Sequence, residues 1–475
     1  MHSLTTGLWT DKYEFTMAQA YVEDNIHNRS ACFDYFFRTQ PFGGGYVVFA
    51  GLEDVLDGLR AFRFDDDSLD FLKSQGYRPA FLDYLSQFRF RGAVYSVREG
   101  EVVFANEPVV RVEGTLIEAQ LVETLILSMV NFQSLIATKA ARIRFAAGVE
   151  KTLSDFGFRR AHGPGGIGAA RAAVIGGFNS TSNMAAARRY GLTAAGTMAH
   201  SYVQCYHDEL TAFRAFAASC PNGCILLVDT YDTLHSGLPN AIRVAKEMEA
   251  KNQRLFGIRL DSGDLAYMAK QARKMLDAEN LNYVKIAASN QLDEYLIRSL
   301  KQQGAPIDLF GVGTRLVIGD PEGTLDGVYK LSMVNGAACM KVSDSLSKAT
   351  LPGVKQIRRF SNGQGAFAAD AIVLQDEPTI ERMIHPTEPH KTFELAGLSC
   401  EELLVKVMDG GERTAEPVSA ARSADYARSR LALLPEEYKR FEFPHIYKVG
   451  LSAKLKNQRD ELIGRYQKSQ RGAKR

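Results

Sequence analysis

The middle of the chain repeats one pattern, a short apolar run followed by a helical segment, and this repetition limits the possible folds more than any other feature. Four such runs begin at Ile225, Leu255, Tyr283 and Ile307, and each ends in polar or glycine residues. Their starts lie roughly 24 to 30 residues apart, the length of a strand, a crossover helix and two short loops. The sequence therefore predicts parallel strands, in a barrel or in an open doubly wound sheet.

Two earlier runs, 158–161 and 192–195, are expected to add strands to the same sheet. Helices with apolar residues at helical spacing are expected between the strands, at 240–249, 265–276 and 293–301. Barrels and open parallel sheets both bind ligands at the carboxyl ends of their strands. The residues just after each run are therefore the first candidates for a functional site.

The chain before this repeat has a mixed α/β pattern. A helix is expected over 11–21, and short strands are expected over 31–37, 93–97 and 109–113. A long segment, 115–147, has a helical pattern and leads into the repeat. These elements indicate a mixed domain before the parallel one.

The chain after the repeat begins with a hairpin signal. Strand-like segments at 328–334 and 338–343 flank Asn335 and Gly336, a pair that favours a tight hairpin turn. We predict three parts: an N-terminal α/β domain (1–135), a (β/α) barrel domain (136–327), and a C-terminal region of β hairpin and helices (328–475) that packs partly on the N-terminal domain.

Composition and charge exclude several classes of protein. With 475 residues, 45% hydrophobic and 24% charged, the chain resembles ordinary globular proteins and not disordered ones. Its net charge of +2 gives no reason to expect nucleic acid or an acidic membrane as a partner. The six cysteines lack zinc-ligand spacing, no basic leader precedes an apolar segment, and no uninterrupted apolar stretch of about 18 residues occurs. We therefore expect a cytoplasmic protein with reduced thiols.

Chemically active side chains collect just after the expected strands. Because parallel strands end on one rim, residues far apart in sequence can surround one ligand there. The rim residues are Arg160, His162, His200, Ser201, Asp229, Thr230, Arg259, Asp261, Ser262, Gly263, Asp264, Ser289, Asn290, Gly311, Gly313, Thr314 and Arg315.

Arg259 is the most specific of these rim residues. It interrupts an apolar strand and so needs an anionic partner, and Asp261, two positions on, lies on the same face of the strand end. A guanidinium can hold a substrate carboxylate through two parallel hydrogen bonds. Asp264, at the start of the next helix, is also explained as its N-cap.

Other rim residues have both a functional and a structural explanation. Asp229 and Asp261 could bind Mg²⁺ or polarise hydroxyls, but acidic strand ends also cap helices. The segment 311–315 offers backbone N–H groups and a hydroxyl to a phosphate, or is only a turn. Taken alone, a histidine such as His200, in 196–201, is more often structural, and only its neighbours on the rim make it part of a site.

Several motifs along the chain occur together in one known family. In order, they are Leu8–Tyr13 with Thr16 and Met17, Phe36–Arg38 with Pro41–Gly44, Gly196–Ser201, Val228–Tyr231, Arg259–Asp264 and Gly311–Thr314. In residues and in order, this set closely resembles the nicotinate phosphoribosyltransferase family. The resemblance extends from about residue 8 to about residue 375.

The resemblance implies a fold and an activity. The fold is an α/β fold, an irregular (β/α) barrel of the type II phosphoribosyltransferase kind, with an α/β N-terminal domain and a C-terminal β/α extension. The implied reaction forms nicotinate mononucleotide and pyrophosphate from nicotinate and phosphoribosyl pyrophosphate, in NAD salvage. It uses Mg²⁺, or Mn²⁺ in its place, and ATP as a co-substrate whose hydrolysis is coupled through a phosphohistidine. The family forms homodimers with shared sites, so Tyr13 and the loop at Phe42 and Gly43 are expected to reach the partner's barrel.

The resemblance also implies roles for single residues. His200 matches the catalytic histidine that is phosphorylated, Tyr13, Thr197 and Arg259 match contacts with nicotinate, and Thr314 matches a contact with the phosphoribosyl donor. Ser182 is expected beside the nicotinate ring. No metal ligand is assigned. Together with the rim, the expected phosphoribosyl pyrophosphate site comprises Arg160, Asp229, Asp261, Ser262, Gly263, Ser289, Gly313 and Thr314.

Three alternatives are open at this point. Nicotinamide phosphoribosyltransferase shares the barrel and the histidine, but it has an aspartate where an ungapped alignment of 178–182 places Ser182, and a neutral residue suits an anionic ring better. Quinolinate phosphoribosyltransferase has shorter chains and lacks the phosphohistidine motif. A catalytically silent relative that binds pyridine nucleotides is the third, and intact His200, Arg259 and Asp261 argue against it.

Overall fold

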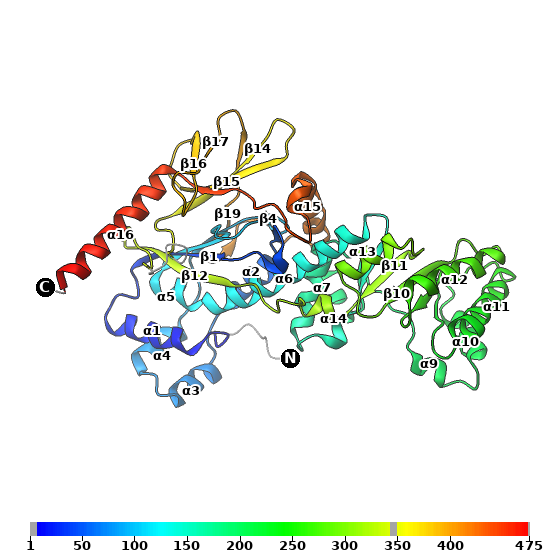
Figure 1. The fold of residues 1–475 in the computed structure, drawn as a ribbon. Helices are drawn as coiled ribbons and strands as arrows, with labels where there is room; N and C mark the ends of the chain where they lie inside the picture. The colour runs from blue at the N-terminus through cyan, green and yellow to red at the C-terminus, as the bar shows by residue number, and fades with distance from the viewer. Residues whose placement is uncertain (1–6, 343–348, 474–475) are drawn as a thin grey trace. The chain divides into compact units, whose positions relative to one another are not determined.

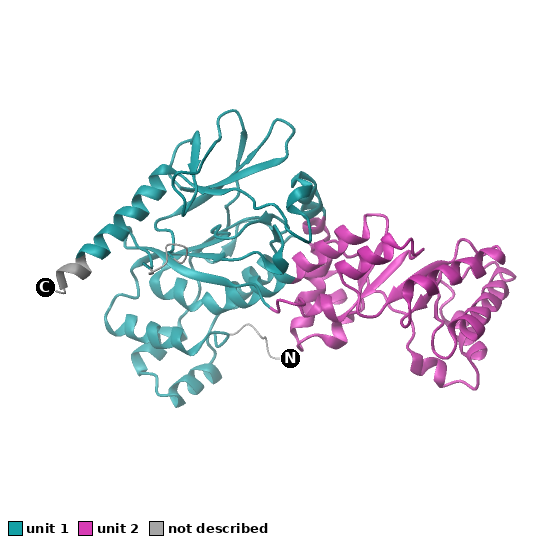
Figure 2. Ribbon diagram, viewed as in Figure 1, with its two compact units in different colours: residues 1–135, 324–418, 425–475 teal, residues 136–323, 419–424 magenta. Residues whose placement is uncertain are grey.

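The computed structural model describes residues 7–342 and 349–473 (Figure 1). The chain forms two compact units (Figure 2). Unit 1 consists of residues 1–135, 324–418 and 425–475, and unit 2 consists of residues 136–323 and 419–424. Most of the chain after residue 328 therefore lies in the same unit as the first 135 residues.

Unit 1 contains an antiparallel sheet whose strand order, in the described part of the chain, is β13-β12-β1-β5-β3-β19-β20. Phe33, Tyr35 and Phe37 of β1 enter the core, which suits aromatic residues on a pleated, buried strand. The strands are β1 (Ser30–Phe37), β3 (Ala93–Ser96), β5 (Val110–Thr115), β12 (Gly327–Val334), β13 (Ala337–Ala338), β19 (Val405–Asp409) and β20 (Glu412–Arg413).

The sequence predicts most of this sheet. The strands expected within 31–113 and at 328–334 are confirmed to within two residues. Asn335 and Gly336 both have positive φ, 50° and 74°, as the expected hairpin turn requires. The strand expected over 338–343 is wrong beyond Ala338, where β13 ends, because the chain leaves the sheet there. Residue 343, the last of the expected strand, lies outside the described residues.

Helices of unit 1 pack on this sheet, and the two expected helical segments, 11–21 and 115–147, are confirmed. Thr115 and Glu118 form a capping box that fixes the start of the second one. The helices are α1 (Lys12–Glu23), α2 (Leu52–Ala61), α3 (Asp66–Ser74), α4 (Pro79–Ser86), α5 (Leu116–Leu121) and α6 (Glu123–Ala147), and α6 continues into unit 2 after residue 135. Two short strands of unit 1, β2 (Val47–Val48) and β4 (Val102–Val103), pair with each other in an antiparallel arrangement.

One helical run among the described residues, Leu116–Ala147, is long and apolar enough to cross a membrane. In the structure, 67% of its most apolar window is buried. Buried core helices pass the same test of length and hydropathy, so the run is only weak evidence for a membrane span.

The later part of unit 1 forms a second sheet, which the sequence did not predict. Among the described residues its order is β17-β16-β21-β15-β14-β18. Arg359 on β14 is fully buried and pairs with Asp370 and Glu101, so the apolar pattern is interrupted by internal charges. The strands are β14 (Lys355–Ser361), β15 (Phe367–Leu374), β16 (Arg382–Ile384), β17 (Thr392–Glu394), β18 (Ser399–Glu402) and β21 (Val449–Leu451). The helices of this part of the chain are α15 (Ala420–Leu433), which begins in unit 2 and enters unit 1 at residue 425, and α16 (Ala453–Ala473).

Unit 2 is built on a parallel sheet with the order β7-β6-β11-β10-β9-β8 in the part of the chain that the structure describes. The four regularly spaced runs are confirmed as β8 to β11, and three of them begin two residues later than expected. The strands are β6 (Thr152–Asp155), β7 (Ser180–Thr181), β8 (Ile225–Leu227), β9 (Gly257–Leu260), β10 (Lys285–Ser289) and β11 (Leu309–Val312).

Crossover helices join these strands, and the three expected ones are confirmed. Asp264 and Asp293 cap two of them by accepting backbone N–H groups. The helices are α7 (Gly165–Ile175), α8 (Met184–Tyr190), α9 (His200–Gln204), α10 (Glu209–Ser219), α11 (Leu238–Glu249), α12 (Leu265–Ala278), α13 (Glu294–Gln302) and α14 (Thr314–Val317).

Two of the expected strands in unit 2 are wrong. The run 158–161 begins with a short 3-10 helix, Phe158–Arg160, that follows β6, and its one large apolar side chain is 43% exposed. The run 192–195 contains only one isolated parallel bridge, between Ala194 and Thr181. Its small residues bury too little apolar surface to hold a strand in the sheet.

Strands β7 and β8 are at opposite ends of the strand order, so the ladder of paired strands is open between them. The α/β class with its parallel sheet is as expected. Closure of this sheet into a barrel stays a prediction.

Candidate active site

The carboxyl ends of β8, β9 and β10 bring His200, two carboxylates and several hydroxyls together in unit 2. His200 is the first residue of α9, directly after the extended residue Ala199. Its side chain is 40% exposed, so the ring faces solvent and can meet a ligand. It does not leave a buried strand, as the sequence suggested, because residues 192–195 form no strand.

The ring of His200 lies between a hydroxyl and two carboxylates. Its Nδ1 is 3.2 Å from Oγ1 of Thr230. Its Nε2 is 4.0 Å from Oδ1 of Asp229 and 3.9 Å from Oδ2 of Asp261. Two carboxylates on the Nε2 side favour a proton on that nitrogen and a lone pair on Nδ1.

Asp229 and Asp261 form one hydrogen-bonded pair. Oδ2 of Asp229 accepts the backbone N–H of Asp261 at 2.8 Å and the hydroxyl of Ser262 at 2.7 Å. Asp261 in turn accepts the hydroxyl of Ser289 through Oδ1. These bonds fix the oxygens that face His200.

This pair offers oxygen ligands that suit Mg²⁺. Oδ1 of Asp229 is buried and has no hydrogen-bond partner in the described part of the chain, and Oδ2 of Asp261 is directed to the same ring. Mg²⁺ usually takes one or two carboxylates, several waters and substrate phosphate oxygens. No group of three or more acidic, histidine or cysteine ligands occurs among the described residues, and none is needed for such a site.

Arg259 on β9 is a half-buried cation that forms no salt bridge with a carboxylate among the described residues. Its guanidinium donates to the hydroxyl of Thr197, and its Nε is buried without a partner in the described residues. Burial lowers the pKa of Arg259, with the nearby cation Arg159 adding to the effect, while Asp261 and Asp229 oppose it. A partly buried cation with an unsatisfied N–H, and with a second cation near enough to affect its pKa, is suited to an anion.

Asp155 at the end of β6 organises the neighbouring loop, and the sequence gave no signal for it. Its carboxylate accepts the Thr181 hydroxyl at 2.7 Å and the Gly157 N–H at 2.8 Å, while its carbonyl accepts the N–H of Ser182. Burial raises the pKa of Asp155, and the two hydrogen bonds lower it. It therefore holds in place the loop that carries Arg159.

Several expected site residues stand apart from these contacts. Arg160 is exposed beside Arg159, and Ser182 is half-buried at the end of β7. Gly263 makes the turn after β9 with a φ of 74°. Gly313 and Thr314 begin α14 after β11, the next strand of the sheet.

The glycine-rich end of β11 serves packing as well as any ligand. A Cβ on Gly311 would lie 2.4 Å from the ring of Phe156, so only glycine fits there. Arg315 pairs with Asp293 at 2.8 Å and with Asp320 at 3.3 Å, so its charge is already compensated. Asp264 is the N-cap of α12, which confirms the structural explanation for that residue.

Tyr13 lies in unit 1, on α1. Burial raises the pKa of Tyr13 above its ordinary value, and the negative charges of Glu123 and Glu14 add to the effect. The side chain is 46% exposed. In the loop expected to reach a partner, Phe42 is 7% exposed and Gly43 is exposed, so the backbone at Gly43 is its outermost part.

The fold and the rim together are typical of an α/β enzyme: a partly buried cation lies on the same rim as a histidine that faces two carboxylates. Family models match most of the chain: residues 8–131 match the nicotinate phosphoribosyltransferase N-terminal domain, residues 151–371 match the nicotinate phosphoribosyltransferase family, and residues 354–459 match the C-terminal domain.

Relatives agree with these models. A nicotinate phosphoribosyltransferase of Bacillus subtilis is 44% identical over 94% of this chain and 93% of its own length, and one of Dictyostelium discoideum is 36% identical over 96% and 88%. The crystal structure of human nicotinic acid phosphoribosyltransferase is similar with a TM-score of 0.85 and 33% identity, covering 95% of this chain and 99% of that one. The nicotinate-nucleotide pyrophosphorylase of Pyrococcus furiosus has a TM-score of 0.70, 25% identity and coverages of 90% and 95%. The chain belongs to the nicotinate phosphoribosyltransferase family.

Proposed function

We propose that the rim of unit 2 joins nicotinate to the ribosyl group of phosphoribosyl pyrophosphate, releasing pyrophosphate and forming nicotinate mononucleotide. Membership of the family supports this proposal. The observation that carries it is Arg259, a half-buried cation with a free Nε beside Thr197 and near Arg159. A guanidinium in this state suits the carboxylate of nicotinate and not the neutral amide of nicotinamide.

In this proposal, the chain orients the ring and the donor. The ring nitrogen of nicotinate attacks the anomeric carbon while the bond to pyrophosphate breaks, and positive charge develops on the ribose. Arg259 and Thr197 would hold the carboxylate, and the hydroxyls of Ser262 and Ser289 with the loop at Thr314 would lie along the phosphoribosyl group. Arg160 and Gly313 belong to the same proposed phosphate site.

Mg²⁺, or Mn²⁺ in its place, fits the oxygens of Asp229 and Asp261, where it would neutralise charge on the phosphates. The unpartnered Oδ1 of Asp229 supports this assignment. Ser289 and Ser262 hold the two carboxylates in position through their hydroxyls. The chain thus offers an anchored pair of oxygen ligands close to His200.

We also propose that His200 couples ATP hydrolysis to this synthesis. Its Nδ1 would attack the γ-phosphorus of ATP and form the N–P bond, while the bond from that phosphorus to the oxygen of the leaving ADP breaks. The proton would stay on Nε2, on the side of the ring that faces Asp229 and Asp261. Water would later break the N–P bond and release inorganic phosphate. The positions of the two carboxylates on one side of the ring and Thr230 on the other support this choice of nitrogen.

We further propose a cytoplasmic homodimer in which Tyr13 of one subunit completes the site of the other. Tyr13 is 46% exposed, so its ring can contact a partner. The six cysteines, all within the described ranges, are free thiols, as in reducing compartments.

The test is to measure turnover with nicotinate and with nicotinamide, in the wild type and in Arg259→Ala. We expect the wild type to prefer nicotinate. In the variant the nicotinate KM should rise by an amount that corresponds to a loss of about 2 kcal/mol or more in binding free energy, since a hydrogen-bonded charge pair is lost. Arg243→Ala, which removes a surface arginine of α11, is the matched control and should leave the KM unchanged. A wild type that prefers nicotinamide would refute the assignment.

A further inference from the structure

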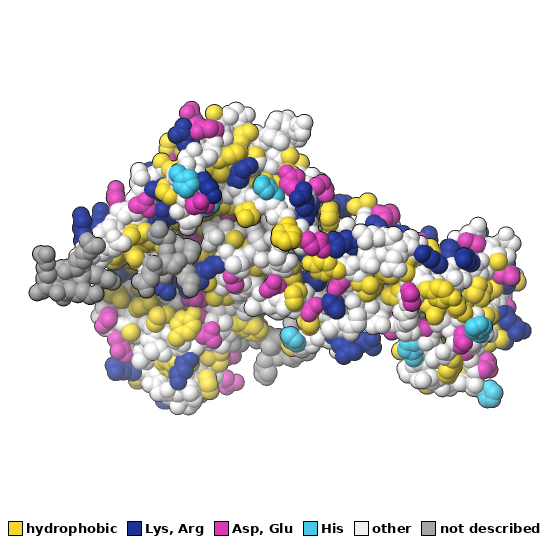
Figure 3. All heavy atoms as spheres, viewed as in Figure 1, with side chains coloured by type: hydrophobic (Ala, Val, Ile, Leu, Met, Phe, Trp, Pro, Cys, Tyr) yellow, Lys and Arg dark blue, Asp and Glu magenta, His cyan; other side chains and the backbone are white. Residues whose placement is uncertain are grey.

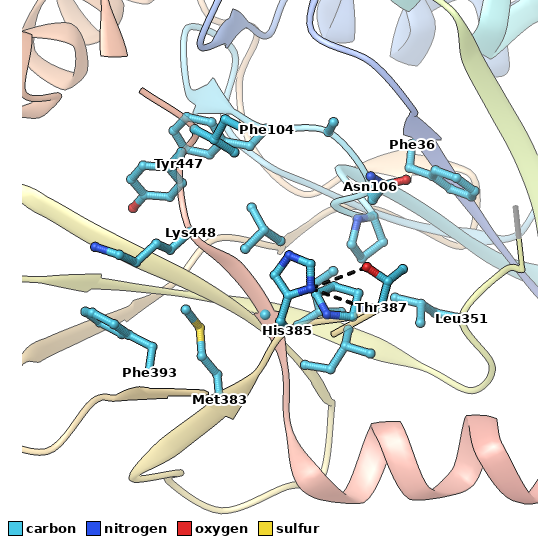
Figure 4. Close-up of a pocket in the computed structure, with 18 of the residues that line it drawn as sticks. Phe36, Phe104, Asn106, Leu351, Met383, His385, Thr387, Phe393, Tyr447 and Lys448 are labelled. Atoms are coloured by element: carbon cyan, nitrogen blue, oxygen red, sulfur yellow. Dashed lines mark hydrogen bonds between the residues drawn. The ribbon is translucent and has the colours of Figure 1, made fainter. Parts of the chain in front are cut away.

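Unit 1 contains a cavity of about 800 Å³ that no part of the proposed reaction uses. Its walls come from both sheets of this unit: β1 and β12 of the first, and β14 to β17 with β21 of the second. Figure 4 shows the side chains around it. The volume is that of pockets that enclose small organic ligands.

Part of the wall is aromatic and flat. Phe104 and Tyr447 stack with their ring centroids 3.7 Å apart and their planes within 10°. Met383 and Phe393 lie on another side in Figure 4, and Leu351 adds an aliphatic surface. Flat apolar walls of this kind accept the face of an aromatic ring.

The cavity also has a positive mouth. Lys448 lies 4.6 Å over the ring of Phe393 and has no carboxylate partner in the described ranges. Asp34, the one acidic residue of the lining among those the structure describes, is neutralised by Lys355 at 2.8 Å. Figure 3 shows Lys, Arg and His side chains over β16 and β17, together with acidic and hydrophobic ones. Because Lys448 has no carboxylate partner in the described ranges, an anionic group is the ligand that the mouth favours.

His385 adds an oriented hydrogen-bond donor. Its Nδ1 accepts the backbone N–H of Glu388 at 3.1 Å, so the neutral ring carries its proton on Nε2. In Figure 4 the other ring nitrogen of His385 is turned away from Thr387, toward the space between the labelled side chains. It can donate to an anionic oxygen without a change of tautomer.

Two acceptor oxygens of the lining lack partners. Oδ1 of Asp34 and Oε1 of Gln40 are buried and have no hydrogen bond within the described residues. Buried acceptors without donors cost stability unless a ligand or water supplies an N–H or O–H group.

We propose that this cavity binds a nucleotide: a flat base with N–H donors beside the aromatic wall and the unpartnered oxygens, and its phosphate at Lys448 and His385. The cavity is wholly within unit 1, so the proposal does not depend on the chemistry assigned to unit 2. Bound nucleotide would join the two sheets of unit 1.

The experiment is calorimetric titration of the full chain with AMP, with adenosine and with inorganic phosphate. AMP should bind more tightly than either part, and Arg259→Ala should retain this binding because it changes only unit 2. Lys448→Glu should weaken AMP about tenfold, since a charged hydrogen bond becomes a repulsion. Lys73→Glu, an exposed lysine of α3 in the same unit, is the matched control and should not change the affinity.

Leu351→Trp, which fills part of the cavity, should abolish AMP binding. Light scattering of the same variants measures their oligomeric state, and so tests whether a second copy of the chain occupies the cavity instead. If Leu351→Trp or Lys448→Glu breaks a dimer while AMP affinity is unchanged, the cavity is an interface between copies and the proposal is wrong. It is also wrong if wild type does not bind AMP, if phosphate alone binds as tightly, or if Lys448→Glu behaves like Lys73→Glu.

Discussion

His200 is the residue whose surroundings carry the most specific chemical meaning. Thr230 lies on its Nδ1 side, and Asp229 and Asp261 lie on its Nε2 side at 4.0 and 3.9 Å. A histidine that only filled space would not need two anchored carboxylates at one nitrogen. The arrangement favours Nδ1 as the nucleophile, with the proton held on Nε2.

The prediction at this scale concerns phosphate transfer to His200. Incubation of the full chain with ATP labelled at the γ-phosphate should leave a label that is stable to base and labile to acid, as an N–P bond is. His200→Ala should lose the label, while His235→Ala, which changes a histidine of the helical turn Thr233–Gly237 that pairs with Asp232, should keep it. A label that survives in His200→Ala would place the phosphate on another residue.

At the scale of elements, α1 and α6 enclose an acidic cluster in unit 1. Burial raises the pKa of Glu14 to about 8, Glu123 and Asp11 add to this rise, and a hydrogen bond from Thr124 opposes it. The folded chain therefore binds a proton here more tightly than the unfolded chain, whose carboxyl titrates near 4.5. The contribution of Glu14 is most favourable at low pH, and it is lost as the pH rises through this window.

We predict that the free energy of unfolding of unit 1 falls between pH 5 and pH 8 in the wild type, and that this fall is larger than that of Glu14→Gln by about 3 kcal/mol. Trp9 is the only tryptophan of the chain and lies in unit 1, so urea unfolding followed by its fluorescence reports on this unit. Glu23→Gln, an exposed residue at the end of α1, is the control. Equal pH dependence in wild type and Glu14→Gln would contradict the prediction.

The regular elements were predictable where one physical signal decided them. Strands β8 to β11 and the helices between them follow from apolar runs at regular spacing, and Asp264 was recognised as a cap. Strand β6 was missed because Thr152–Asp155 contains one large apolar residue, and its burial depends on neighbours in the sheet. The second sheet of unit 1 was missed because ion pairs such as Arg359 with Asp370 interrupt its apolar pattern.

The residues of the candidate site were predictable where the strand that carries them had been predicted. Residues at the carboxyl ends of correctly placed strands, such as Asp229, Arg259 and Asp261, meet in the structure. Asp155 and Arg159 could not be found this way, because the strand before them was not recognised. The cavity of unit 1 has no local sequence signal, since its walls come from segments far apart in the chain.

At the scale of the whole molecule, Tyr13 belongs to unit 1 and His200 to unit 2. If sites are shared across a homodimer, mixed dimers of Tyr13→Ala and His200→Ala contain one intact site. Denaturing and refolding an equal mixture should restore about a quarter of the wild-type rate of ATP-coupled synthesis, because half of the dimers are mixed and each has one of two sites. A mixture no more active than the separate variants would contradict shared sites.

The most direct test of the central claim is the rate at which the purified full chain forms nicotinate mononucleotide from nicotinate and phosphoribosyl pyrophosphate, with and without ATP. We expect synthesis that ATP stimulates, with ADP and inorganic phosphate formed in step with the nucleotide. Absence of nicotinate mononucleotide under both conditions would contradict the activity. Synthesis that ATP does not change would leave the activity standing and refute the role assigned to His200.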